Sequence, residues 1–286
     1  MFKFLKRLFA TPPPNRRATA VPLPPELERK FFDWYDQQGK ASVTFAPDPK
    51  LDFDAKASRL FGPALLRPNE EWPIGQNGKW LYLLAQINCE DCTTLEGYPQ
   101  DGWLQFFIGA DETCAHHPTD PTKSDFLVRW IAPDISLEIR SPPYQLPDGK
   151  FAGEWCSFLP SWTGEPHSKS VGLSARPTQS FPSSALEEVG KKLFELGIVY
   201  GKYEDNELYE AIDDRSLRAH HCGGYPAFAQ DDIRWKPSLD GYDIVLLRLT
   251  SDDHLMWGDC GECVFLMRSK YLLDKDFSKV AYSWDG

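Results

Sequence analysis

The sequence predicts an internally duplicated α+β fold, with two related half-domains built on largely antiparallel sheets and a few helices. Short apolar runs bounded by Gly and Pro predict the strands. The order of three similar sequence blocks predicts the duplication, because self-similarity at a fixed spacing indicates a repeated structural unit. The blocks are FGPALL (61–66) with GGYPAF (223–228) and LLAQIN (83–88) with VLLRLT (245–250), both 162 residues apart, and GWLQFFI (102–108) with GECVFLM (261–267), 159 apart.

The predicted elements follow from local patterns. WLYLLA (80–85) and IVLLRL (244–249) are continuous apolar runs, which are typical of strands buried on both faces. DFLVRWI (125–131) and the alternating ISLEIR (135–140) predict two strands across a Pro-Asp turn. Three helices are expected, at 25–39 with Pro25 in its first turn, at 184–197 with a capping box of Ser184 and Glu187, and at 206–218.

These elements define the expected organisation of the chain. A basic arm and a proline-rich tether occupy residues 1–24, and one domain follows over 25–286. Within this domain we expect half one at about 41–140, an irregular connection at about 141–183, helices at about 184–218 and half two at about 219–286.

Charge and hydropathy restrict the function classes. The 286 residues carry a net charge of −11, which argues against nucleic acid as a partner, because phosphate binding requires clustered Lys and Arg. No apolar run reaches the roughly 20 residues of a membrane-spanning helix. The first 17 residues hold five basic residues and no acidic one, which indicates a short amphipathic arm able to make weak contact with an anionic membrane surface. Its members are Phe2, Leu5, Phe9, Lys3, Lys6 and Arg7.

The seven cysteines predict reduced thiols. Their number is odd, and the opening residues do not form a secretory signal because Lys and Arg interrupt the apolar run, so we expect a cytoplasmic protein, with contact at the inner face of the membrane through the arm. The pairs Cys89/Cys92 and Cys260/Cys263 have the spacing of zinc ligands but lack the Gly-rich turn that presents two sulfurs to one metal. We therefore predict neither a metal nor a cofactor.

Part of the sequence resembles a known family. The motifs are SRLFGPALLRPNEEWP, LYLLAQIN, GWLQFFI, HHCGGYPAFAQDD, VLLRLTSDD, MWGDCGECVFLM and DFSKV, which extend from Ser58 to Val280. Together they are similar to the YwqG-like family, a bacterial family of unknown function. The resemblance implies a duplicated α+β fold and provides no catalytic residue to transfer.

Candidate functional residues point to binding rather than catalysis. The sequence contains no GxSxG, Walker-type, HExxH, GxGxxG or EF-hand motif. Asp259 lies in a glycine turn beside Trp257 and could be joined by His220, while Trp72 and Trp235 are aromatic residues in loops, where they suit ligand stacking or a protein contact. We predict a non-catalytic protein-interaction module, such as an immunity or regulatory protein, whose acidic surface binds a basic partner. The alternative is a hydrolase or carbohydrate-handling enzyme with its site between the two halves.

Overall fold

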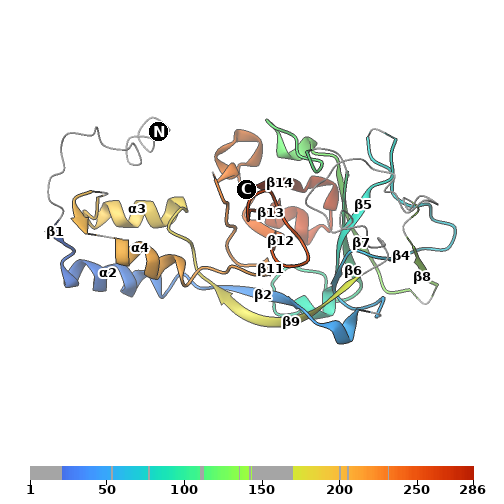
Figure 1. Ribbon diagram of the computed structural model, residues 1–286, viewed down its shortest axis with the longest axis horizontal. Coiled ribbons are helices and arrows are strands. Elements are labelled where there is room, and N and C mark those ends of the chain that lie inside the picture. The colour runs from blue at the N-terminus through green and yellow to red at the C-terminus, as the bar shows by residue number, and fades with distance from the viewer. Residues whose placement is uncertain are drawn as a thin grey trace. The chain divides into compact units, whose positions relative to one another are not determined.

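The computed structural model describes residues 21–286 except 53, 77, 110–112, 135, 142, 144–169, 200, 205 and 231. The predicted membrane contact of the N-terminal arm and most of the expected connection at 141–183 lie outside these described residues. The chain divides into two compact units (Figure 1). A helical unit comprises residues 21–40 and 180–217, and a strand-rich unit comprises residues 41–179 and 218–286.

The helical unit contains the three predicted helices: α2 (Pro25–Tyr35), α3 (Glu187–Glu195) and α4 (Asn206–Asp213). A short parallel pair, β1 (Val21–Pro22) with β10 (Tyr203–Glu204), accompanies them. The Tyr35 hydroxyl donates to the carbonyl oxygens of Pro182 (2.9 Å) and Ile212 (3.1 Å), which ties α2 to the segments before α3 and at the end of α4. The buried apolar residues of this unit are Phe31, Tyr35, Val189, Leu193, Ile198, Leu208 and Ile212.

One local prediction in this unit is wrong. Ser184 does not cap α3, because the residue that precedes the helix is Leu186, which provides no side-chain cap. Ser184 instead donates its hydroxyl to the Asp213 carboxylate at the end of α4 (2.9 Å), and its backbone N–H donates to the same group (2.8 Å). A contact between distant segments has therefore replaced the local capping box.

The strand-rich unit contains a ten-stranded sheet in the order β14-β13-β12-β11-β2-β9-β3-β5-β6-β7. Figure 1 shows the long strands β2 and β9 side by side at its centre. The pairings on both sides of this centre are antiparallel, as predicted. The strands are β2 (Lys40–Pro47), β3 (Arg59–Leu60), β5 (Tyr82–Asn88), β6 (Trp103–Ile108), β7 (Phe126–Ile131), β9 (Val171–Ser180), β11 (His220–Gly223), β12 (Ile244–Thr250), β13 (Glu262–Met267) and β14 (Ala281–Asp285).

A separate two-stranded sheet pairs β4 (Ala64–Leu66) with β8 (Glu138–Arg140). The sequence pattern predicts instead that 125–131 and 135–140 pair with each other across their turn. Strand β7 pairs with β6, and β8 crosses to β4, where Leu65 pairs with Ile139. A Pro-Asp turn signal indicates where a strand ends but does not specify its partner.

The two outer hairpins pair in the same register. In β5–β6, Leu83 is opposite Phe107, the register then shifts, and Ala85 is opposite Phe106. In β12–β13, Val245 is opposite Leu266, the register shifts at the same point, and Leu247 is opposite Phe265. The edge strands continue this correspondence, because Phe106 is opposite Val128 of β7 and Phe265 is opposite Tyr282 of β14. A bulge at the same position in both hairpins bends each strand at the same place.

The turns beside β3 and β11 also correspond. Phe61 (φ 58°) and Gly62 (φ 80°) follow β3, and Gly223 (φ 70°) and Gly224 (φ 71°) stand at the end of β11. Glycine adopts positive φ without a steric penalty, whereas a residue with a Cβ loses roughly 1–2 kcal/mol there. Phe61 tolerates this conformation while its ring is buried against Tyr82, at a centroid distance of 5.9 Å.

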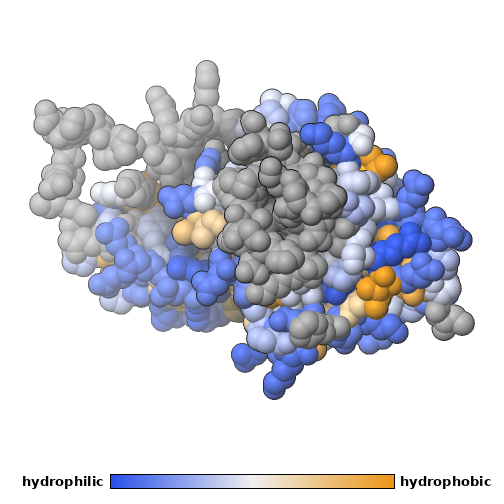
Figure 2. All heavy atoms as spheres, turned by 45° about the vertical axis from the view of Figure 1, so that its right-hand side comes forward, coloured by the Kyte–Doolittle hydropathy of each residue, from blue (hydrophilic) through white to orange (hydrophobic). Residues whose placement is uncertain are grey.

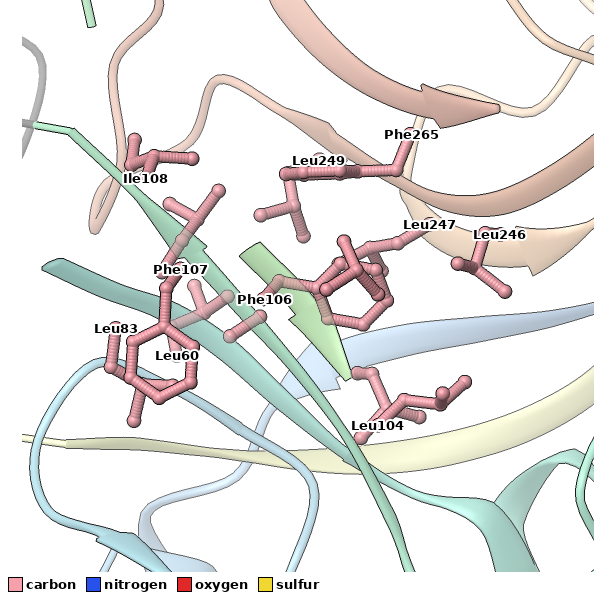
Figure 3. Packing of buried hydrophobic residues seen from close by; sticks show 14 of the residues in the cluster. Leu60, Leu83, Leu104, Phe106, Phe107, Ile108, Leu246, Leu247, Leu249 and Phe265 are labelled. Atoms are coloured by element: carbon pink, nitrogen blue, oxygen red, sulfur yellow. The ribbon is translucent and has the colours of Figure 1, made fainter. Parts of the chain in front are cut away.

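The main core lies where the two ends of the sheet face each other. Side chains from β5 and β6 meet side chains from β12 and β13 in one cluster (Figure 3). At its centre the rings of Phe106 and Phe265 are 4.9 Å apart in an edge-to-face arrangement, a geometry that aromatic pairs favour. The sheet therefore buries one apolar face of each end against the other.

Each edge strand lies against a 3₁₀ helix from the other end of the sheet. The helix η3 (Pro121–Lys123), which precedes β7, lies against β14, and η7 (Phe277–Lys279), which precedes β14, lies against β7. Next to η3, Ser124 donates its hydroxyl to the carbonyl oxygen of Tyr282 (3.1 Å). These contacts cover sheet edges that would otherwise present unpaired backbone groups.

The thiols are mostly free. Cys89, Cys92, Cys222 and Cys263 are buried free thiols, and Cys260 is an exposed one. Cys114 is disulfide-bonded, which corrects the expectation that every cysteine is reduced. Within the described part of the chain, no helix is long and apolar enough to cross a membrane.

We predict that Gly102→Ala lowers the free energy of unfolding by about 2–5 kcal/mol, as measured by chemical denaturation. Gly102 has φ 75°, and an added Cβ would lie 2.1 Å from the carbonyl oxygen of Ile131 on β7. The loss combines backbone strain of about 1–2 kcal/mol with overpacking of about 1–3 kcal/mol.

Gly78→Ala is the matched control. Gly78 has a nearly identical φ of 74°, but an added Cβ meets no atom within 4 Å. The free energy of unfolding of the control should therefore fall only by the backbone strain of about 1–2 kcal/mol. Equal losses in the two variants would show that β6 and β7 do not approach as closely as described.

Candidate functional site

Three of the five predicted site residues belong to one corner of the strand-rich unit. His220 lies on β11, while Trp257 and Asp259 lie in the loop between β12 and β13. Trp72 and Trp235 lie elsewhere. The Trp72 ring is buried against Phe107, and its Nε1 donates to the Leu81 carbonyl oxygen (2.8 Å). Trp235, in η5 (Ile233–Trp235), is 53% exposed, so of these two only Trp235 lies at the surface.

His220 is buried, with 3% of its surface exposed, and both ring nitrogens are engaged. Nδ1 accepts a hydrogen bond from the backbone N–H of Thr250 (3.1 Å), so Nδ1 is the unprotonated nitrogen. Nε2 therefore carries the proton and donates to Oδ2 of Asp252 (3.1 Å). A general base needs a free lone pair that faces its substrate, and neither nitrogen of His220 provides one here.

Asp252, which the sequence analysis did not single out, organises the loop after β12. Its Oδ1 accepts from the backbone N–H groups of His254 (2.8 Å) and Leu255 (2.9 Å). Burial alone would raise the pKa of this carboxyl group. The hydrogen bonds from His220, His254 and Leu255 outweigh burial and hold the pKa below its usual value. The available signal was an Asp two residues after a strand, which is a frequent turn residue and not specific to a site.

Trp257 anchors the same loop from inside the core. Its ring is fully buried and lies 6.2 Å from the Trp284 ring. Its backbone N–H donates to Ser251 Oγ (2.8 Å), and its carbonyl oxygen accepts from the Gly261 N–H (2.7 Å). Asp259 is exposed in the turn between these anchors. The loop thus exposes the carboxylates of Asp253 and Asp259, while Trp257 and His220 serve packing and orientation.

Several buried thiols favour their protonated form. Burial raises the pKa of Cys89, Cys222 and Cys263. Metal binding and nucleophilic attack both require the thiolate, which burial opposes here. No group of three or more His, Cys, Asp or Glu in the described part of the chain is arranged to hold a metal ion.

A different feature stands out in the helical unit, on the exposed side of α4. Glu207 and Glu210 of this helix and Asp214, the residue after it, are exposed at spacings of three and four residues and so share one side. We call these three residues the acidic stripe. The opposite side of α4 carries the buried Leu208 and Ile212.

In α2 and α3, basic residues of the same helix pair with some of the acidic ones, whereas α4 has no basic residue to do so. In α2, Lys30 pairs with Glu26 (2.7 Å), and in α3, Lys191 pairs with Glu187 (2.8 Å). The sequence of α4, NELYEAID, contains no basic residue. Within the described part of the chain, Glu207 and Glu210 form no ion pair. Like charges three or four residues apart repel each other, by roughly 0.2–0.5 kcal/mol for each pair.

We predict that Asp252→Asn lowers the free energy of unfolding at pH 7 by about 1–3 kcal/mol, because hydrogen bonds to a charged group are lost. A carboxyl group whose folded pKa is depressed stabilises the fold above its unfolded pKa. That stabilisation disappears as the pH falls through the folded pKa. The difference between wild type and variant, followed by urea unfolding from pH 7 to acid, should therefore shrink at low pH.

Asp253→Asn provides the control, because Asp253 is the adjacent exposed carboxylate and makes none of the bonds made by Asp252. It should leave the stability nearly unchanged at both pH values. A constant deficit of Asp252→Asn at every pH would mean that the charge of Asp252 contributes nothing.

Comparison with known proteins identifies a family without assigning an activity. None of the curated proteins matches the chain. The family described as Domain of unknown function (DUF1963) matches residues 58–286. The matched region contains every strand of the ten-stranded sheet except β2, the loop between β12 and β13, and α4. The match begins at Ser58, where the resemblance noted in the sequence also begins. The chain therefore belongs to the DUF1963 family, a family of unknown function.

Proposed function

We propose that this protein is a non-catalytic interaction module that binds a basic protein partner through the acidic stripe of α4. The observation that carries the proposal is the concentration of exposed, like-charged carboxylates on one side of that helix. Such an arrangement costs stability in the isolated protein, because the charges repel each other. It also places negative charge near the C-terminal end of the helix, where the helix dipole is unfavourable to anions. A cationic partner relieves both effects.

The surface chemistry supports a polar interface. On the face shown in Figure 2, hydrophilic residues predominate and hydrophobic residues form small, separate patches. The whole chain carries a net charge of −11. Complementary charge accelerates the encounter of two proteins and selects between partners, and its effect weakens with added salt. We propose that the protein acts as an immunity or regulatory protein that neutralises a basic partner.

We also propose that the chain is YwqG-like and that its two sheet halves arose by duplication. The matching registers of β5–β6 and β12–β13, with a bulge at the same position, support this origin. Two further correspondences support it. Turns with positive φ follow both β3 and β11, and each edge strand lies against the 3₁₀ helix that precedes the other edge strand.

The alternative role as a hydrolase or carbohydrate-handling enzyme requires a free acid and a free base near each other. His220, a predicted binding residue, could act as a base only through a free ring nitrogen, and both of its nitrogens are bound within the fold. No observation in the described residues favours the alternative over binding.

The double variant Glu207→Gln/Glu210→Gln tests the proposed function. We expect it to recover its basic partner from a host lysate about 5–30-fold less efficiently than wild type does, since two exposed charges of about 0.5–1 kcal/mol each are removed. The readout is affinity capture with quantitative mass spectrometry at two salt concentrations. Capture by wild type should fall as salt rises.

The control variant Glu187→Gln/Glu195→Gln changes the net charge by the same amount within the same unit. Its carboxylates are already paired with Lys191 and Lys192 on α3. It should therefore capture the partner as wild type does. If wild type and the α4 variant recover the same proteins in the same amounts, the acidic stripe is not the binding surface.

A further inference from the structure

Four polar side chains form a row across one end of the sheet. Strand pairing places Arg59 of β3 opposite Gln86 of β5, Gln86 opposite Gln105 of β6, and Gln105 opposite Arg129 of β7. Residues directly opposite each other share a face of the sheet, so the four side chains lie side by side. We call them the arginine–glutamine row. Arg59, Gln86 and Gln105 are buried, and the Arg129 side chain is 17% exposed.

The two glutamines are held in fixed orientations. Gln86 Nε2 donates to the Ala55 carbonyl oxygen (2.9 Å). Gln105 Nε2 donates both to the Leu65 carbonyl oxygen (2.9 Å) and to Gln86 Oε1 (2.9 Å). Because these bonds orient both amides, the side-chain oxygens available in the row are already in use.

The two arginines have more donors than the row has acceptors. Arg129 Nε donates to Gln105 Oε1 (2.9 Å), and Nη1 pairs with Glu70, yet the buried Nη2 has no hydrogen-bond partner among the described residues. Arg59 donates through Nη2 to the carbonyl oxygen of Pro63, and no described residue accepts a hydrogen bond from its buried Nε. A guanidinium group carries five N–H bonds and no acceptor, so only an acceptor from outside the row can satisfy what remains.

Arg59 is also a buried cation that no carboxylate of the described residues contacts. It is 1% exposed, and burial lowers its pKa to about 10, an effect that the charge of Asp54 opposes from a distance. The buried Arg248 provides a contrast, because Glu262 on the neighbouring strand pairs with its guanidinium group. An unpaired buried charge is strongly unfavourable, and a neutral water molecule would satisfy an N–H group but leave the charge.

We propose that the arginine–glutamine row is a binding site for a small oxyanion, either a carboxylate or a phosphate group. The anion accepts hydrogen bonds from the unpartnered N–H groups of the arginines and supplies the negative charge that Arg59 lacks. Planar guanidinium groups suit these oxyanions because two parallel N–H groups match two oxygens. This site lies in the strand-rich unit and is independent of the acidic stripe on α4.

The test is the thermal midpoint of the full chain in phosphate, acetate or chloride at equal ionic strength. An anion present at about ten times its dissociation constant should raise the midpoint by roughly 3–6 °C, since it binds only the folded protein. Phosphate and acetate distinguish the two oxyanion types, and chloride reports the effect of salt alone. Isothermal titration of the better oxyanion should give saturable binding.

Arg59→Met and Arg129→Met should each reduce or abolish the shift. Arg59→Met should also raise the midpoint without anion, because replacing an unpaired buried charge with an apolar side chain removes its desolvation cost. Arg234→Met is the matched control, since Arg234 of the same unit is already paired with Asp232 (2.6 Å) and should keep the full shift. Arg59→Lys, which keeps the charge but not the planar fork, should retain a reduced shift if Arg59→Met does not fold.

Two results would overturn the proposal. One is an equal midpoint of wild type in all three anions. The other is an oxyanion shift that both Arg59→Met and Arg129→Met retain in full.

Discussion

The contact between Phe106 and Phe265 marks the constraint on which the strand-rich unit depends. Each end of the ten-stranded sheet has an apolar face that must be buried, and in the main core the two faces are buried against each other. The bulges after Leu83 and Val245 bend both hairpins at corresponding positions, so the two faces approach each other with aromatic rings at the centre. The main core therefore requires both ends, although β12, β13 and β14 also bury a smaller cluster of their own.

The same constraint accounts for the position of the two 3₁₀ helices, each of which lies against the edge strand at the other end of the sheet. Once the two ends face each other, β7 and β14 are edge strands with backbone groups to cover. Each is covered by the 3₁₀ helix that leads into the other, and the Tyr282 hydroxyl adds a hydrogen bond to the Cys114 carbonyl oxygen (2.8 Å). The edges are thus protected by segments that are adjacent in space and about 150 residues apart in sequence.

What the sequence could predict was local. The apolar runs that became β5, β6, β12 and β13 contain their own signal, and so do the three helices. A contact between distant segments has no signal in the local sequence. The pairing of β8 with β4 and the hydrogen bond of Ser184 to Asp213 could therefore not be predicted. Trp72 and Trp257 illustrate the same limit, because an aromatic residue in a loop has the same local pattern whether its ring covers the core or faces a ligand.

The two proposals rest on two features that oppose stability, and these features differ in kind. The acidic stripe is a surface feature, so solvent and salt reduce its cost, and its chain positions could be read from NELYEAIDD (206–214) without a structure. The arginine–glutamine row is buried, so its cost is not screened, and it exists only because four strands pair in one register. A buried cation without a carboxylate persists in a fold only if some other gain offsets its desolvation. At Arg248 that gain is Glu262, whereas no carboxylate among the described residues pairs with Arg59, and we propose that a bound oxyanion takes this place.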